Sequence, residues 1–250
     1  MNDVTVAAVA IILSGMAVGT LVKGVTGGGL PMVAVPVMAT FLGVEEAVVV
    51  MAIPSVATNL WMMWSNRAAA GRAQGLPTLI LTGVVGVLAG VMLLAALDDR
   101  WLAAALAAVI VVYLILQFAR PGSRLSPQTV RWLRPVAGGG AGLLQGATGV
   151  SSPALIMYLH ALRLDRELYL FSITAMIAVT ASAQSISLGI AGLYTPGRLI
   201  ASGLAMIPVA VVLPLAMQMG RRLPRHRFDL LVRLLLAGAA VKLLFDAITG

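Results

Sequence analysis

The sequence predicts an all-α integral membrane protein with two inverted repeats, each a broken or re-entrant helix segment followed by three transmembrane helices. Three observations predict this fold: very few charged residues, long uncharged stretches, and one short motif that occurs twice. Of the 250 residues, 60% are hydrophobic and only 10% are charged, whereas charged residues make up about 25% of a soluble domain. So little charge could not cover a water-soluble fold, so the expected solvent is the lipid bilayer.

Four uncharged stretches match the thickness of a bilayer. They cover residues 4–22, 47–65, 73–97 and 168–197, and a helix needs roughly 20 apolar residues to cross the hydrocarbon core. The stretches are continuous and rich in Ala, Leu, Val and Gly, whereas the strands of a membrane barrel alternate in polarity. Helices are therefore the predicted spanning elements.

Hydrophobic runs and turn signals divide the chain into segments. The predicted segments are 4–42, interrupted near 23–29; 46–65; 75–97; 101–118; 135–161, interrupted near 145–152; 168–190; 198–218; and 228–248. No basic residues precede the first run, so we expect a retained segment and not a signal peptide. The predicted division is repeat 1 over 1–118, a basic cytoplasmic linker over 119–134, and repeat 2 over 135–250.

Two arginine clusters set the predicted orientation. They comprise Arg120, Arg124, Arg131 and Arg134 in one connection and Arg221, Arg222, Arg225 and Arg227 in another. Both should be cytoplasmic, because loops rich in arginine stay inside. Three segments lie between the clusters, so one must turn back, and the glycines and proline within 135–161 favour that segment. By analogy 4–42 also returns to its starting side. We therefore expect a multi-pass protein of the cytoplasmic (inner) membrane with both termini outside.

The repeat is visible in a nine-residue motif. Residues 23–31 (KGVTGGGLP) align with residues 145–153 (QGATGVSSP), with Gly, Thr, Gly and Pro matched at identical spacing. A re-entrant segment plus three spans makes an odd number of crossings, so the second copy is inverted. Secondary transporters with inverted repeats place discontinuous helices near the bilayer midplane, where these helices form the substrate site.

The two breaks are predicted to bind an anion. Glycines allow positive φ and close backbone approach, and a half-helix N-terminus exposes N–H groups that attract anions. The alternative is that these small residues only permit tight helix packing, but the paired motif favours a site. The candidate residues are Lys23, Gly24, Thr26, Gly27, Gly28, Gly29 and Pro31 in the first copy, and Gln145, Gly146, Thr148, Gly149, Ser151, Ser152 and Pro153 in the second.

Lys23 is the basic residue that lies far inside an apolar stretch. A cation there costs at least about 2.5 to 3.5 kcal/mol on insertion scales. An anionic substrate would compensate it, and the alternative is that the long side chain snorkels to an interface. Asn59 and Gln184 are polar positions within predicted spans. They either line the cavity or form hydrogen bonds between helices.

Other classes of function find no support in the residues. The chain has no cysteine and only two histidines, so neither a metal site nor a disulfide is predicted. Phosphate-loop, zinc-protease and Ser/His/Asp patterns are missing, so we expect neither an enzyme nor a cofactor. The formal charge of +8 follows from membrane orientation and not from nucleic-acid binding.

The two broken segments resemble the paired signatures of the TauE/SafE family of sulfite exporter-like permeases. The resembling stretches are residues 19–38 (GTLVKGVTGGGLPMVAVPVM) and residues 142–162 (GLLQGATGVSSPALIMYLHAL). The resemblance implies transport of sulfur-containing anions such as sulfite, sulfonates or sulfoacetate, without ATP, with substrate bound at 23–31 and 145–153. Val150, Ser151 and Ser152 depart from the glycine pattern.

Several alternatives stay open at this point. An anion channel of the same architecture is the main alternative to a carrier, and a non-transporting membrane subunit is a more distant one. No acidic residue falls clearly at midplane depth, so a carboxylate proton relay is not evident. The coupling ion, a proton or sodium, stays open. The expected partners are a small anion and membrane lipid, and a homo-oligomer is compatible with the sequence.

Overall fold

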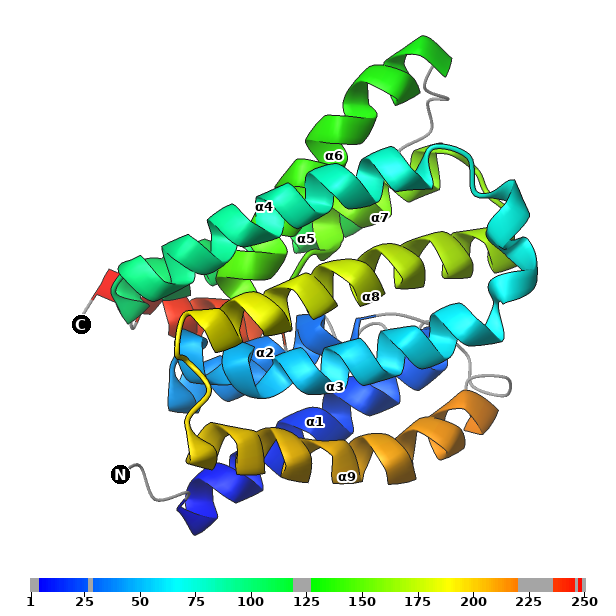
Figure 1. Cartoon of the computed structure of the whole chain (residues 1–250). Helices are drawn as coiled ribbons and strands as arrows, with labels where there is room; N and C mark the ends of the chain where they lie inside the picture. The colour runs from blue at the N-terminus through cyan, green and yellow to red at the C-terminus, as the bar shows by residue number, and fades with distance from the viewer. Residues whose placement is uncertain (1–4, 27–28, 119–126, 220–235, 246, 249–250) are drawn as a thin grey trace.

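The computed structural model describes residues 5–26, 29–118, 127–219, 236–245 and 247–248. Regular structure in these residues is entirely helical, which confirms the predicted all-α class (Figure 1). The elements are α1 (Val6–Thr26), α2 (Leu30–Leu42), α3 (Val44–Ser65), the 3₁₀ helix η1 (Arg67–Arg72), α4 (Leu76–Ala96), α5 (Asp99–Phe118), α6 (Pro127–Thr148), α7 (Ser152–Ala161), α8 (Arg166–Ile190) and α9 (Pro196–Met219). A further helical segment covers Leu236–Phe245.

Within the described residues, five helices are long and apolar enough to cross a membrane. These candidate spans are Val6–Gly24, Val44–Ser65, Leu76–Ala96, Arg166–Ile190 and Pro196–Ala216. Their outer faces are apolar: α4, for example, exposes Leu81, Val85 and Met92. A water-soluble protein does not expose apolar surface on this scale. The protein is therefore a multi-pass membrane protein.

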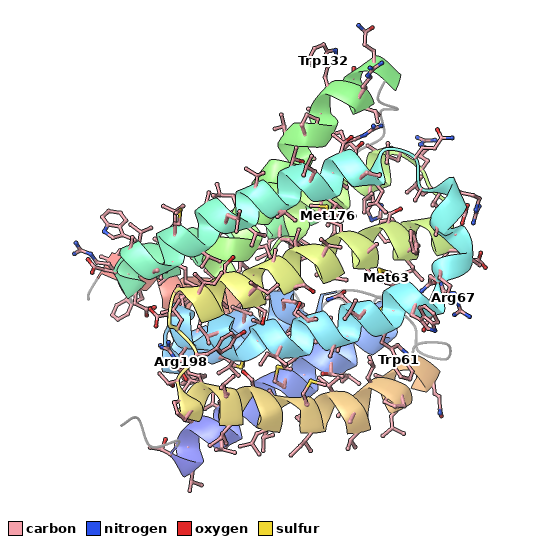
Figure 2. All side chains as sticks on the ribbon, viewed as in Figure 1. Trp61, Met63, Arg67, Trp132, Met176 and Arg198 are labelled. Carbon is pink, nitrogen blue, oxygen red and sulfur yellow. The ribbon has the colours of Figure 1, made fainter. Side chains whose placement is uncertain are left out.

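Exposed tryptophans lie near the ends of the helices, as they do in proteins that sit in a bilayer. Trp61 near the end of α3 and Trp132 near the start of α6 both point away from the bundle (Figure 2). Trp101 is likewise exposed at the start of α5. Indole rings favour the interface between lipid and water, and exposed tryptophans near helix ends agree with a membrane protein.

Both predicted helix breaks are present. The first lies between α1 and α2, and the second between α6 and α7. Helix α2 returns to the end of the bundle at which α1 begins, and α7 returns to the end at which α6 begins (Figure 1). Gly29 and Gly149 have φ of 93° and 69°, values that L side chains rarely adopt. A proline stands in the first turn of both α2 and α7, where its missing N–H costs no hydrogen bond.

Helix α6 begins earlier than the sequence predicts. It starts at Pro127, inside the segment expected to be a linker over 119–134. Its first turns project beyond the other helices (Figure 1), and Arg131 and Trp132 are exposed there. Charged residues can therefore belong to a helix that extends past the bilayer. Residues 119–126 and 228–235, parts of the predicted linker and of the last segment, lie outside the described residues.

Helices of the two halves pack against each other in exchanged pairs. Helix α1 lies along α9, α4 lies along α6, and α3 packs against α8. The α4–α6 contact is made through glycines: a Cβ on Gly86 would clash with the carbonyl of Gly139, and one on Gly142 would clash with the carbonyl of Gly83. Such small residues let helix backbones approach closely in membranes.

Candidate functional site

The side chain of Lys23 is enclosed by protein near the end of α1. It is 3% exposed, and its Nζ donates hydrogen bonds to Thr58 Oγ1 (3.3 Å) and Asn59 Oδ1 (3.1 Å) of α3. The ammonium group is therefore buried against α3 and not extended into solvent, which argues against the snorkelling alternative.

The two partners of Lys23 are themselves held in place by α3. The Thr58 hydroxyl donates to the Pro54 carbonyl (2.8 Å), and Asn59 Nδ2 donates to the Ser55 carbonyl (2.8 Å). Both side chains therefore direct oxygen atoms at the ammonium group. An ammonium group has three N–H donors, and these bonds use two of them.

No carboxylate balances this lysine among the described residues. The ion pairs found there are made by Arg72 and Arg198. Two neutral oxygen atoms satisfy hydrogen bonds but do not cancel the charge. A buried charge without a counter-ion is costly, so the ammonium group makes the site attractive to an anion.

The second break carries a neutral version of the same arrangement. Gln145, 1% exposed, aligns with Lys23. Its Nε2 donates to Gln184 Oε1 (3.1 Å) of α8, and Gln184 Nε2 donates to the Gln145 carbonyl (2.7 Å). Oε1 of Gln145 is buried and has no hydrogen-bond partner in the described part of the chain. In each half, the residue before the break thus bonds to a polar residue of the third helix.

The helices that follow the breaks begin without side-chain caps. Gly29 precedes α2, and Ser151 precedes α7 without accepting a capping hydrogen bond. The Ser151 side chain is buried, while the Thr148 hydroxyl donates to the Leu144 carbonyl (2.7 Å) within α6. Amide groups of the first turn lack partners within a helix. The N-termini of both half-helices therefore offer backbone N–H groups that can donate hydrogen bonds to an anion.

The glycines of the two motifs have different surroundings. A Cβ on Gly146 would clash with the Val87 carbonyl of α4, so Gly146 is needed for packing. A Cβ on Gly149 would lie 3.4 Å from both Val35 and Val48, which places the second break against α2 and α3 of the first half. Gly24 lies within α1.

Several candidate residues cannot be placed. Gly27 and Gly28 lie outside the described residues, as do the side chains of Thr26, Ser152 and Pro153. Two inverted repeats would place Gly27 near Gly149 around a pseudo-two-fold axis, and this expectation stays a prediction.

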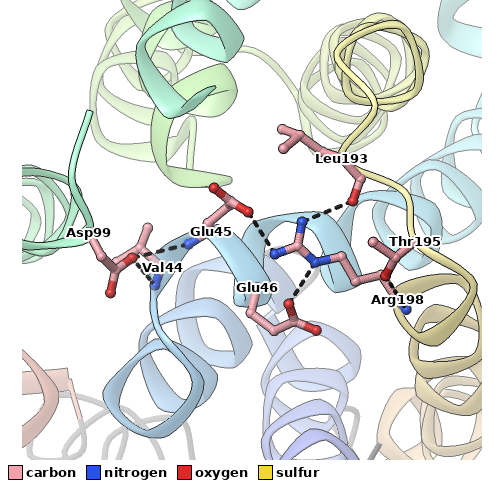
Figure 3. A network of polar contacts seen from close by, with 7 residues as sticks. All are labelled: Val44, Glu45, Glu46, Asp99, Leu193, Thr195 and Arg198. Carbon is pink, nitrogen blue, oxygen red and sulfur yellow. Dashed lines mark hydrogen bonds and ion pairs between the residues drawn. The ribbon is translucent and has the colours of Figure 1, made fainter. Parts of the chain in front are cut away.

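Two clusters of ion pairs join the halves at opposite ends of the bundle. Arg198 of α9 contacts Glu45 (2.6 Å) and Glu46 (2.7 Å) of α3, beside Asp99, whose carboxylate accepts from the Val44 N–H (2.8 Å) (Figure 3). We call these residues the Arg198 cluster. Its arginine side chain is only 15% exposed. Sequence reasoning did not find this cluster, although Glu45 and Glu46 at a helix start were a visible signal.

The second cluster, at the other end, is more open. Arg72 contacts Asp165 (2.6 Å) and Glu167 (3.7 Å), and its side chain is 52% exposed. A hydrogen bond from the Leu168 N–H and a second from Arg72 lower the pKa of Asp165. We call these residues the Arg72 cluster. The Arg72 cluster joins the start of α4 to the start of α8, and the Arg198 cluster joins the start of α9 to the start of α3. In both clusters, an arginine of one half contacts acidic residues of the other half.

The comparison with known families covers nearly the whole chain. Residues 11–243 match the family model described as Sulfite exporter TauE/SafE. No curated protein and no solved structure matches the chain.

Proposed function

The chain belongs to the sulfite exporter TauE/SafE family, and we propose that it is a secondary transporter that binds its anion between the two helix breaks and works by alternating access. The family consists of membrane transporters of sulfur anions and not of enzymes. The substrate class is therefore a small sulfur-containing anion, such as sulfite, a sulfonate or sulfoacetate.

The observation that carries the proposal is the buried ammonium group of Lys23. Its two protein partners are neutral oxygen atoms of Thr58 and Asn59. A sulfite or sulfonate group would supply the missing negative charge and accept the remaining N–H. Hydrogen bonds to a charged group contribute about 1.5 to 3 kcal/mol, enough to offset much of the insertion cost of the lysine.

The charge of the two breaks favours a monoanion. The first break carries one cation, Lys23, and Gln145 at the matching place is neutral. One fixed positive charge balances one negative charge, as in a sulfonate or hydrogen sulfite. The unpartnered Oε1 of Gln145 is an acceptor, and we assign it either to a hydrogen bond from a protonated substrate or to coordination of a sodium ion as coupling ion.

Alternating access is supported by the exchanged helix pairs and the two clusters. Opening one end of the bundle requires Arg198 to separate from Glu45 and Glu46. Opening the other end requires Arg72 to separate from Asp165 and Glu167. The ion pairs of both clusters are formed in this structure, and Arg198 is less exposed than Arg72. A channel must open both ends together, whereas a carrier opens them in turn, and two separate clusters favour ends that open independently.

The topology completes the proposal. We place the Arg72 cluster in the cytoplasm and the Arg198 cluster outside the inner membrane, with both termini outside, because arginine-rich connections stay inside. The first repeat comprises residues 1–118 and the second 135–250. One copy contains both breaks, so transport does not require a homo-oligomer.

Counterflow in proteoliposomes tests the proposal. Vesicles with the purified chain are loaded with unlabelled sulfite and diluted into trace ³⁵S-sulfite. A carrier accumulates label transiently, because internal substrate returns the binding site to the outer face. If the labelled sulfite only reaches the same concentration inside and outside the vesicles, without transient accumulation, the channel alternative is indicated. Uptake equal to that of empty vesicles would indicate a non-transporting subunit.

A further inference from the structure

A cavity of about 310 Å³ lies beside the Arg72 cluster, between α4, α6, α7 and α8. Its polar lining consists of Arg72, Gln74, Arg134, Tyr158 and Ser172, and leucines form much of the rest. This volume is at the lower end of the roughly 300 to 1,000 Å³ of ligand pockets. The lining includes no residue of α1, α2 or α3. The cavity is therefore separate from the Lys23 site.

Arg134 brings a positive charge to this cavity. Its Nε donates to the hydroxyl of Tyr158 (3.2 Å), a residue that is 6% exposed. No ion pair among the described residues includes Arg134, whereas Arg72 is paired with Asp165. A guanidinium has five N–H donors, and the bond to Tyr158 uses one. The remaining donors suit the oxygen atoms of a planar or pyramidal oxyanion.

The guanidinium group of Arg134 lies directly against the backbone just before α4. A Cβ on Gly75 would clash with this group, and Gly75 has φ of 77°, which favours glycine. The Tyr158 hydroxyl accepts from Nε of the same group. The guanidinium group therefore lies at the wall of the cavity, with donors left for a ligand.

We propose that this cavity is a second anion site, in which Arg134 binds the sulfite or sulfonate group of the substrate between the Lys23 site and the cytoplasm. This inference rests on the proposed function for the identity of the anion. Two ligands could place an oxyanion on the guanidinium group of Arg134: the free substrate anion and the phosphate of a lipid headgroup. We favour the free anion because the donors lie in a half-open cavity lined by residues of α4, α6, α7 and α8, beside the charged Arg72 cluster.

Chemical protection of Arg134 tests the site in the unmodified protein. The purified full chain in neutral detergent is treated with phenylglyoxal, and the modification rate of each arginine is measured by mass spectrometry. The probe is sodium methanesulfonate, which does not react with phenylglyoxal. The modification rates in its presence are compared with those in sodium chloride at equal ionic strength. Arg131 on the same helix is exposed and is the internal control. When the methanesulfonate concentration is roughly ten times its dissociation constant, the modification rate of Arg134 should fall about tenfold. The modification rate of Arg131 should not change.

The same measurement in Lys23→Gln separates the two sites. Protection of Arg134 should persist in this variant, because its cavity contains no residue of α1. Protection that disappears in Lys23→Gln would overturn a second site, as would equal effects on Arg131 and Arg134 or none. Protection by phosphatidylglycerol micelles but not by methanesulfonate would assign the cavity to lipid and overturn the proposal. Failure of counterflow alongside protected Arg134 would instead contradict the transport function and leave the anion site standing.

Discussion

The Nζ atom of Lys23 lies 3.1 Å from Oδ1 of Asn59, in the interior between α1 and α3. The matching contact in the other half joins Gln145 and Gln184 at the same separation. One contact carries a charge and the other does not. The two breaks therefore have related geometry but different electrostatics, and this asymmetry underlies the predictions for Lys23.

Asn59→Asp should weaken anion binding without unfolding the protein. The change is nearly isosteric and places a carboxylate beside Lys23, which neutralises the ammonium group. Loss of a charge-assisted contact of about 1.5 to 3 kcal/mol lowers affinity roughly ten- to hundredfold. The measurement is the apparent affinity for sulfite in proteoliposomes.

A double-mutant cycle provides the control for Asn59→Asp. In a Lys23→Gln background the buried carboxyl that Asn59→Asp introduces has no cation beside it and should be protonated, so Asn59→Asp should weaken binding much less there. Additive losses in the double variant would show that Asn59 does not act through Lys23.

Gly142→Ala should destabilise the fold, because the added methyl group would meet the backbone carbonyl of Gly83. Overpacking of this kind costs about 1 to 3 kcal/mol, or roughly 2 to 10 °C in Tm for a chain of this size. The measurement is thermal unfolding in detergent. Gly140→Ala is the matched control on the same helix, since a Cβ there meets no atom within 4 Å. An equal Tm for both variants would contradict the close α4–α6 packing.

Arg198→Gln should open the end of the bundle that the Arg198 cluster closes. The carboxylates are partly exposed, so we expect a loss of only about 1 to 2 kcal/mol, or about tenfold in the opening equilibrium. The reporter is Ser202→Cys, a buried position one turn along α9, in a chain without native cysteine. An impermeant thiol reagent should label it about tenfold faster in the Arg198→Gln background.

Arg100→Gln is the control for the Arg198 cluster. Arg100 lies over the exposed ring of Trp101 and does not join the halves. If Ser202→Cys labels equally fast with and without Arg198, the cluster does not close this end.

Single cysteines should also report the topology. Gly197→Cys, beside the Arg198 cluster, should label from outside the cell, and Gly71→Cys, beside Arg72, only after the cytoplasmic face is exposed. A Cβ at Gly71 meets no atom within 4 Å, so that substitution is tolerated. Labelling of both sites from one face would contradict the placement of the two clusters on opposite sides of the membrane.

The sequence predicts the helical class, both breaks and four of the five polar residues that pair near them, and Thr58, which also accepts from Lys23, was missed. Long hydrophobic runs predict helices, because a chain that crosses lipid must pair its own backbone N–H and C=O groups. The doubled motif locates the breaks. The pairing of Lys23 with Asn59 was not predictable, since it depends on how α1 and α3 are rotated about their axes. The start of α6 was missed because Arg131 and Arg134 look like loop residues, although an extended helix can carry them past the lipid.

Longer-range contacts were also beyond the sequence pattern. The Arg198 cluster joins residues of α3 and α9, and no local spacing relates Arg198 to Glu46. Likewise, glycines in α4 and α6 signal close packing in general but do not state which helices meet. The cavity at Arg134 arises from four helices together, so only the folded arrangement reveals it.

The central claim is that Lys23 supplies the fixed charge that binds the anion, and the affinity of Lys23→Gln for sulfite tests it most directly. The variant reproduces the residue at the matching place in the second half and removes the charge with a modest change in size. Lys242→Gln, at an exposed lysine, is the control and should bind as the native chain does. We predict that Lys23→Gln folds but binds sulfite roughly ten- to hundredfold more weakly. Unchanged affinity in Lys23→Gln would contradict the claim and leave the half-helix amides as the binding groups.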